Sequence, residues 1–156
     1  MTVLDRPAPD AKPDFVLVTY IRCSHDALWD ALTSGEAIAA HHFAGLNASG
    51  DLKGADDRQV FSSPQGPVVT HRAVEVDPKS RLAFALHPDW SPDVPVSYAV
   101  FRLEAAGPAM RLTMEHWGKG PCGGDASNGW SRFAASLKSW LETGNRLHVP
   151  MSGEAA

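Results

Sequence analysis

The residues in this sequence best suited to chemistry are its seven histidines, because imidazole is the side chain that ordinarily gains and loses a proton near neutral pH. His116 stands out among them. In the segment RLTMEHW it follows Leu112 and Met114 at every second position, which places the three side chains on one face of a strand. An imidazole on an inward, apolar face must be hydrogen-bonded to backbone, water or a ligand. His116 is therefore either a satisfied core histidine or, if the protein is an enzyme, its general acid or base.

A catalytic His116 needs a second polar group within reach of its ring. Glu115, next to it in the chain, and Asp89, in the segment HPDWSPDVP, are candidates for that group. Alternation along the strand turns Glu115 outward, away from His116. The sequence thus offers an acid/base candidate without a clear partner.

The other histidines form no pattern typical of a metal site. His41 and His42 are adjacent on a short predicted helix, EAIAAHHF, so their side chains diverge by about 100° and cannot chelate together. At least one of the two should be solvated. The sequence contains no His-x-x-x-His or Glu-x-x-His pair, and we expect no metal and no cofactor.

Nucleophile and phosphate-binding motifs are weak or absent in the sequence. Cys23 stands beside a predicted helix start with His25 two residues on, which leaves two interpretations: a reactive thiol or a small buried hydrophobic residue. No Gly-x-Ser-x-Gly motif occurs. The glycine-rich GKGPCGGDASNG matches neither a phosphate-binding loop nor the dinucleotide fingerprint, and we interpret it as a mobile segment before the last helix.

The last amphipathic segment, GWSRFAASLKSWLETG, gathers its large apolar residues on one helical face about 120° wide. These residues are Trp130, Phe133, Ala134, Leu137, Trp140 and Leu141. Such a face covers either a solid core or the wall of a hollow that holds a ligand. A straight helix on a curved sheet leaves room for the second alternative.

The elements that position these residues follow from the periodicity of the sequence. DFVLVTYIR is typical of a strand; CSHDALWDALTSGEAIAAHHF predicts two short helices, the first capped by Ser24; about six strands follow from about residue 46 to 117; and a long helix ends the series. Consecutive strands with short connections indicate an antiparallel sheet, and only the last helix is long and apolar enough to cover it. We therefore predict an α+β domain over residues 14–148, with a flexible arm at 1–13 and a flexible tail at 149–156.

Composition narrows the classes of function. The 156 residues carry a net charge of -4 and no local lysine and arginine cluster, which argues against nucleic-acid binding. No apolar run approaches the roughly 20 residues of a membrane span, and the N-terminus has no secretory h-region. The two cysteines, Cys23 and Cys122, stand in no Cys-x-x-Cys pair. We expect reduced thiols and a cytoplasmic protein.

Four segments together resemble a known family. They are VTYIRCSHDALWDALTSGEAIAAHHF, AVEVDPKSRLAFALHPDW, and RLTMEHWG followed by GWSRFAASLKSWLETG. Their order and spacing are similar to the START-like (SRPBCC) superfamily, in the branch resembling the activator of the heat-shock chaperone ATPase. The resemblance spans Phe15 to Leu147. It implies a helix-grip fold, in which a curved antiparallel sheet of about seven strands grips the C-terminal helix with a cavity between them.

The resemblance also implies what the cavity does. Family members bind hydrophobic or amphipathic small molecules, cyclise polyketides, or assist a chaperone. We expect the ligand-binding residues to be Phe43, Leu86, Trp90, Phe101, Leu112, Met114, His116, Trp130, Phe133 and Leu137. His116 would orient the ligand by a hydrogen bond, and Trp90 is either a lid or a partner contact. Branch members often carry an aromatic residue where this chain has Leu86, which reshapes the pocket mouth.

Three functions remain open at this point. The first is binding of a small apolar or amphipathic molecule in the cavity, without a cofactor. The second is an enzyme of the cyclase or hydrolase type in the same cavity, with His116 as acid/base. The third is a protein-interaction module, with Val16, Val18 and Tyr20 as an apolar stripe on the convex side of the sheet, facing a chaperone partner or a second copy in a homodimer.

Overall fold

The computed structural model describes residues 7–8, 10–89, 93, 95–118 and 126–149. The predicted site residue Trp90 and the second cysteine, Cys122, lie outside these residues, as does most of the predicted arm and tail. The elements run in the order β1 (Phe15–Ile21), α1 (His25–Thr33), α2 (Gly35–His41), β2 (Asn47–Ser49), β3 (Arg58–Ser63), β4 (Gly66–Asp77), β5 (Arg81–Pro88), β6 (Ser97–Ala106), β7 (Ala109–Trp117) and α3 (Ala126–Thr143). The predicted order of one strand, two helices, six strands and one helix is confirmed.

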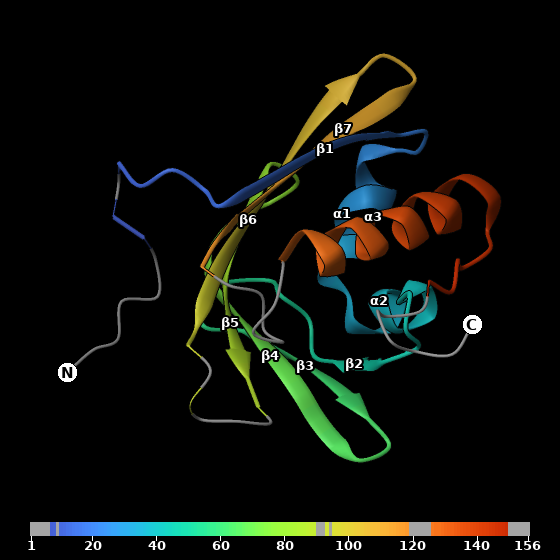
Figure 1. Cartoon of the computed structure of the whole chain (residues 1–156). Coiled ribbons are helices and arrows are strands. Elements are labelled where there is room, and N and C mark those ends of the chain that lie inside the picture. The colour runs from blue at the N-terminus through green and yellow to red at the C-terminus, as the bar shows by residue number, and fades with distance from the viewer. Residues whose placement is uncertain (1–6, 9, 90–92, 94, 119–125, 150–156) are drawn as a thin grey trace.

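All seven strands form one antiparallel sheet in the order β1-β7-β6-β5-β4-β3-β2. Every neighbouring pair except β1–β7 joins strands that are consecutive in the chain. The sheet is bent, and α3 lies across its concave side together with α1 and α2 (Figure 1). The α+β class and the helix-grip arrangement predicted from the sequence are therefore confirmed.

Strict alternation of side chains gives the sheet its buried concave face. On β7, Met110, Leu112, Met114 and His116 are buried while the residues between them are half-buried. The register pairs Phe101 of β6 with Met114, so both strands turn the same apolar face toward α3. This period of two is the pattern that predicted the strands.

Two serines and a glycine fix the pair of short helices. The Oγ atom of Ser24 accepts a hydrogen bond from the backbone N–H of Ala27, and the Oγ atom of Ser34, between α1 and α2, accepts one from Ala37. Gly35 then packs directly on β2, where a Cβ atom would come within 2.6 Å of the carbonyl oxygen of Gly50. This close approach sets the position of α2 and of the residues that follow it.

The chain after α3 returns to the end of α2. The buried hydroxyl of Ser136 donates to the carbonyl oxygen of His41 at 2.6 Å and accepts a bond from the N–H of Leu147 at 3.0 Å. The N–H of Val149 donates to the carbonyl oxygen of Phe43 at 3.3 Å. These bonds tie α3 to the segment between α2 and β2.

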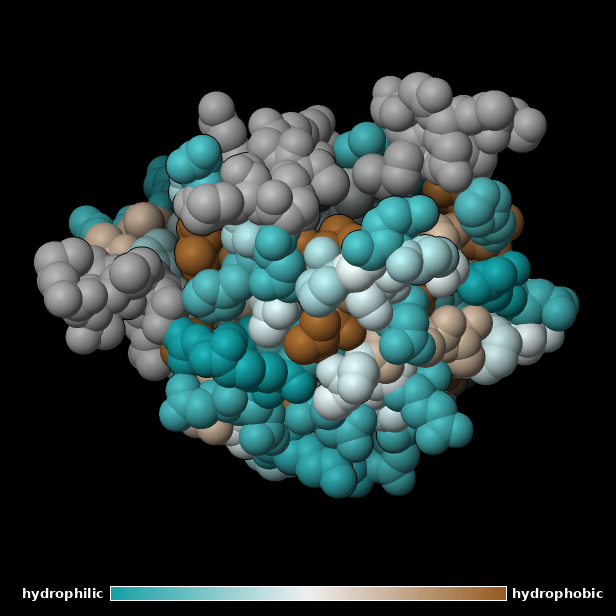
Figure 2. All heavy atoms as spheres, turned by 90° about the horizontal axis from the view of Figure 1, so that it is seen from below, coloured by the Kyte–Doolittle hydropathy of each residue, from teal (hydrophilic) through white to brown (hydrophobic). Residues whose placement is uncertain are grey.

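The surface of the molecule is mainly polar where Figure 2 shows it. On the face seen from below Figure 1, hydrophobic residues reach the surface in small patches separated by hydrophilic ones. Large exposed hydrophobic side chains gather instead on β1, where Val16, Val18 and Tyr20 are exposed.

Replacing Ser136 with alanine should lower the free energy of unfolding by about 1–3 kcal/mol, because it leaves the buried carbonyl of His41 and the partly buried N–H of Leu147 without their shared partner. Urea denaturation measures the difference. Ser139→Ala is the matched control: its hydroxyl bonds the carbonyl oxygen of Asn145 in a more exposed position, and its loss should cost less than about 0.5 kcal/mol. Equal losses in the two variants would contradict the role given to Ser136.

Candidate functional site

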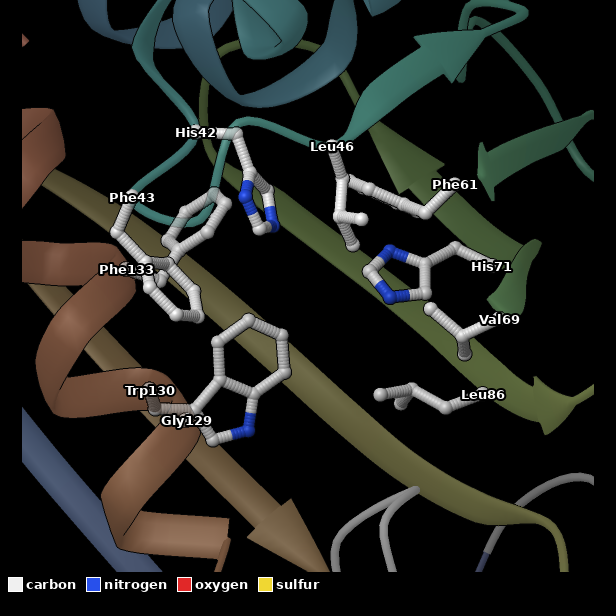
Figure 3. Close-up of a pocket in the computed structure, with 10 residues that line it drawn as sticks. All are labelled: His42, Phe43, Leu46, Phe61, Val69, His71, Leu86, Gly129, Trp130 and Phe133. Atoms are coloured by element: carbon white, nitrogen blue, oxygen red, sulfur yellow. The ribbon is translucent and has the colours of Figure 1, made fainter. Parts of the chain in front are cut away.

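A pocket of about 110 Å³ opens between the start of α3, the segment after α2, and the strands β3, β4 and β5. Figure 3 shows the side chains arranged around it. Helix α3 contributes Gly129, Trp130 and Phe133; the segment after α2 contributes His42, Phe43 and Leu46; and the strands contribute Phe61, Val69, His71 and Leu86. The walls are apolar and aromatic except for the two histidines.

Trp130 forms one wall of the pocket with its carbon surface. Its indole N–H donates to Nδ1 of His116 at 2.9 Å, so its polar atom is satisfied inside the protein. The indole ring makes edge contacts with Phe101 and Phe133 at centroid distances of 5.3 and 5.6 Å. These contacts hold the ring in one orientation with the pocket beside it.

His116 does not line the pocket. It is fully buried, and its Nδ1 atom is the acceptor for Trp130. Its two candidate partners are engaged elsewhere: Glu115 pairs with Arg102 on the outer face at 2.8 Å, and Asp89 accepts a bond from the hydroxyl of Thr70 at 2.8 Å. The structure thus places His116 in the core, where it positions Trp130 through this hydrogen bond. Trp130, and not His116, lines the pocket.

The structure brings together only part of the predicted site. Phe43, Leu86, Trp130 and Phe133 surround the pocket. Phe101 lies on a second, smaller cavity of about 10 Å³, which shares Phe61, His71, Trp130 and Phe133 with the first. Leu112 and Met114 of β7 and Leu137 of α3 are instead almost fully buried in the core.

Six lining residues were not predicted: His42, Leu46, Phe61, Val69, His71 and Gly129. A usable signal existed for β4, because Val69, His71 and Ala73 alternate on one face of the segment VVTHRAVEVD. His71 had no evident partner in the sequence, and it is now seen between Phe61 and Phe84, with ring centroids 4.6 Å from each. No pattern in the sequence indicated the point along the strands at which α3 diverges from the sheet.

The expectation that His41 or His42 is solvated was wrong, since both are buried. The His41 ring bonds the carbonyl oxygen of Ala31 at 2.8 Å. The His42 ring stacks on Phe43 at 4.6 Å, and its Nδ1 atom accepts a bond from the N–H of Ala44 at 3.1 Å. The two side chains diverge, as expected for adjacent helical positions, and each lies in a different buried environment.

Burial keeps the two pocket histidines neutral. Burial, with a smaller contribution from the nearby His42, lowers the pKa of His71 from 6.5 to about 3. Burial likewise lowers the pKa of His42 to about 4, with a smaller effect from His41. Both rings are therefore uncharged imidazoles at pH 7, able to donate and accept one hydrogen bond each.

The surroundings of Cys23 favour the structural interpretation of its thiol. Its partial burial raises the thiol pKa, and the charge of Glu142 raises it further. His25 bonds the carbonyl oxygen of Lys79 and not the sulfur.

Within the described part of the chain, no three His, Cys, Asp or Glu side chains come together as a metal site would require. No helix in the same residues is long and apolar enough to cross a membrane.

The bent antiparallel sheet, the long C-terminal helix on its concave side and the apolar opening at the start of that helix define a helix-grip protein. Residues 22–142 match the family model described as Activator of Hsp90 ATPase homolog 1-like protein, and the chain belongs to this family. No curated protein sequence matched the chain.

Solved structures agree on the fold. Protein MLL2253 from Mesorhizobium loti is 23% identical with a TM-score of 0.66, over 81% of this chain and 96% of that one. The Aha1 dimer from Colwellia psychrerythraea is 18% identical with a TM-score of 0.66, over 83% and 96%. CalU16 from Micromonospora echinospora is 18% identical with a TM-score of 0.61, over 83% and 76%. At these identities the likeness concerns the fold alone.

Stability should fall steeply as the pH drops below 6.5. Above that pH, His42 and His71 are neutral in both the folded and the unfolded chain. Below it, the unfolded chain takes up protons that the folded chain excludes until about pH 4 for His42 and about pH 3 for His71. Each group then lowers the free energy of unfolding by up to about 1.4 kcal/mol per pH unit.

Urea denaturation at pH 7.5, 6.5, 6.0 and 5.5 measures this slope, in a range above the ordinary pKa of carboxylates. In His71→Phe the slope of the free energy of unfolding against pH should decrease by about the contribution of one histidine. An unchanged slope in that variant would contradict the buried, neutral state of His71.

Proposed function

We propose that this protein binds a small hydrophobic or amphipathic molecule in the pocket beside Trp130. The observation that supports the proposal is the pocket itself: an apolar opening of about 110 Å³ between sheet and helix, with aromatic walls on three sides. Burial of apolar ligand surface would supply most of the affinity, at about 25 cal/mol per Å² before the entropic costs of binding.

The proposal describes binding without turnover. Among the described residues, neither pocket histidine shares a hydrogen bond with a carboxylate that would make it an acid/base pair. His116, the acid/base candidate of the sequence, is removed from the pocket by its bond with Trp130. A cyclase or hydrolase activity in this pocket therefore has no catalytic pair to support it.

For the bounds of the domain and the location of the protein, the proposal keeps the expectations from the sequence. We take residues 14–148 as the single domain, with the arm and the tail outside it. The free thiol of Cys23 agrees with a cytoplasmic location.

A second candidate function uses the outside of the sheet. Val16, Val18 and Tyr20 lie on the edge strand β1 with 49%, 43% and 53% of their surfaces exposed. Such a stripe is suited to a protein partner, and the similar protein from Colwellia psychrerythraea is described as a dimer. A chaperone-activating role, suggested by the family's description, would use this surface and not the pocket.

Light scattering on a size-exclusion column tests dimer formation, and an ATPase assay with a purified heat-shock chaperone tests activation. If β1 is the contact surface, Val18→Lys should abolish dimer formation or ATPase activation, whichever the wild type shows. A monomer that leaves the ATPase rate unchanged would remove the second candidate.

Native mass spectrometry of the freshly purified protein tests the first proposal directly. The expected result is a co-purifying small molecule, lost in Val69→Phe, because the larger ring fills the pocket from the β4 side. Val18→Phe makes the same substitution on the exposed outer face and should leave retention unchanged.

Toluene provides a second readout where no molecule co-purifies. It should raise the melting temperature of the wild type and of Val18→Phe but not of Val69→Phe. If toluene stabilises no variant, or stabilises Val69→Phe as strongly as the wild type, the pocket is not the binding site.

A further inference from the structure

Two imidazoles present hydrogen-bonding atoms to the interior of the pocket. His42 reaches in from the segment after α2, and His71 reaches in from β4 on a different wall. In Figure 3, one nitrogen of His42 and both nitrogens of His71 lie on the sides of the rings that face the pocket. The remaining lining residues offer only carbon atoms at this place, apart from Trp130, whose N–H is already bonded to His116.

Three of the four ring nitrogens of these two histidines have no hydrogen-bond partner among the described residues. Because Nδ1 of His42 accepts the N–H of Ala44, the neutral His42 ring carries its proton on Nε2, and that N–H donates to no described residue. The ring nitrogens of His71 likewise have no hydrogen-bond partner among the described residues. Buried polar groups ordinarily have partners, so a donor and an acceptor face the pocket together.

The charge of the pocket selects against ionic ligands. None of the described residues that line it carries a charged side chain, and the two histidines are held neutral by burial. A cation would find no carboxylate and an anion no permanent positive charge, while either would lose its hydration on entering. A neutral group that both donates and accepts, such as a hydroxyl, suits two neutral imidazoles.

The size of the pocket limits what can enter. An apolar cavity of about 150 Å³ holds benzene. A pocket of about 110 Å³ that is open on one side therefore takes a single aromatic ring, and any larger remainder of the ligand must project outward. Rings on the walls favour an aromatic occupant, because edge-to-face pairs add to the energy of burial.

We infer that the group buried in this pocket is a neutral, one-ring aromatic alcohol of the phenol class. Its ring packs against Trp130 and Phe133, and its hydroxyl donates to His71 and accepts from Nε2 of His42. This inference rests on the proposed binding function and adds the ligand class and the two residues that recognise it. It assigns the polar recognition to His42 and His71, in place of the His116 expected from the sequence.

The test compares phenol with toluene, which has the same ring without the hydroxyl. Dissociation constants for the full chain are measured by NMR titration. Phenol should bind the wild type about tenfold more tightly than toluene, as expected for hydrogen bonds that satisfy otherwise unpaired groups. Benzoate and benzylammonium, which add a negative and a positive charge, should both bind more weakly than phenol at pH 7.

His71→Phe removes the polar atoms and keeps a ring of similar shape. It should bind toluene within about threefold of the wild type and lose most of the preference for phenol. His25→Phe is the matched control, because His25 is exposed at the start of α1, away from the pocket, and this variant should keep the full preference. Circular dichroism establishes that each variant is folded.

A measurement on the wild type covers the case in which His71→Phe does not fold. In protein with ¹⁵N-labelled histidine, phenol should shift the ring-nitrogen signals of His71 and His42, and toluene should shift them much less.

The outcomes separate the two proposals. Binding of neither toluene nor phenol would overturn the pocket and this inference together. Equal binding of the two, a phenol preference that survives in His71→Phe, tighter binding of a charged analogue, or unchanged histidine signals would overturn the inference alone.

Discussion

The hydrogen bond from the indole of Trp130 to His116 is the contact on which the site depends. It joins the first turns of α3 to the far end of β7, and both of its members are buried, so breaking it would strand two polar atoms away from water. Around it, Phe84, Phe101 and Phe133 hold the indole edge-on. The helix start is thereby fixed at a set distance from the sheet, and the pocket is the space left beside the fixed ring.

The histidines of this chain illustrate how the same side chain takes different parts according to its surroundings. His116 accepts from an indole, and His41 bonds a carbonyl at the end of α1. Burial lowers the pKa of both His42 and His71, yet their unbonded ring nitrogens face the pocket and not the core. A burial pattern alone does not distinguish these cases; the identity of the bonding partner does.

The sequence predicted the architecture well because its signals are local. Alternation in β7, the cap at Ser24, and the stripe on α3 each depend on residues close in the chain. The site was harder, because a pocket lies where two elements diverge. Leu112 and Trp130 are on equally apolar faces, yet one lies in the core and the other lines the opening. That difference comes from the bend of the sheet and the position of α2, which no short pattern encodes.

One feature of the interior bears on how such proteins diversify. The larger pocket and the small cavity near Gln59 share four lining side chains, Phe61, His71, Trp130 and Phe133. A smaller residue in place of Phe61 or His71 would enlarge the space that borders both, while Leu112 and Met114 stayed buried in the core. Single substitutions can therefore change the length of ligand that the pocket accepts while the fold is kept. A shared fold in this family need not mean a shared ligand.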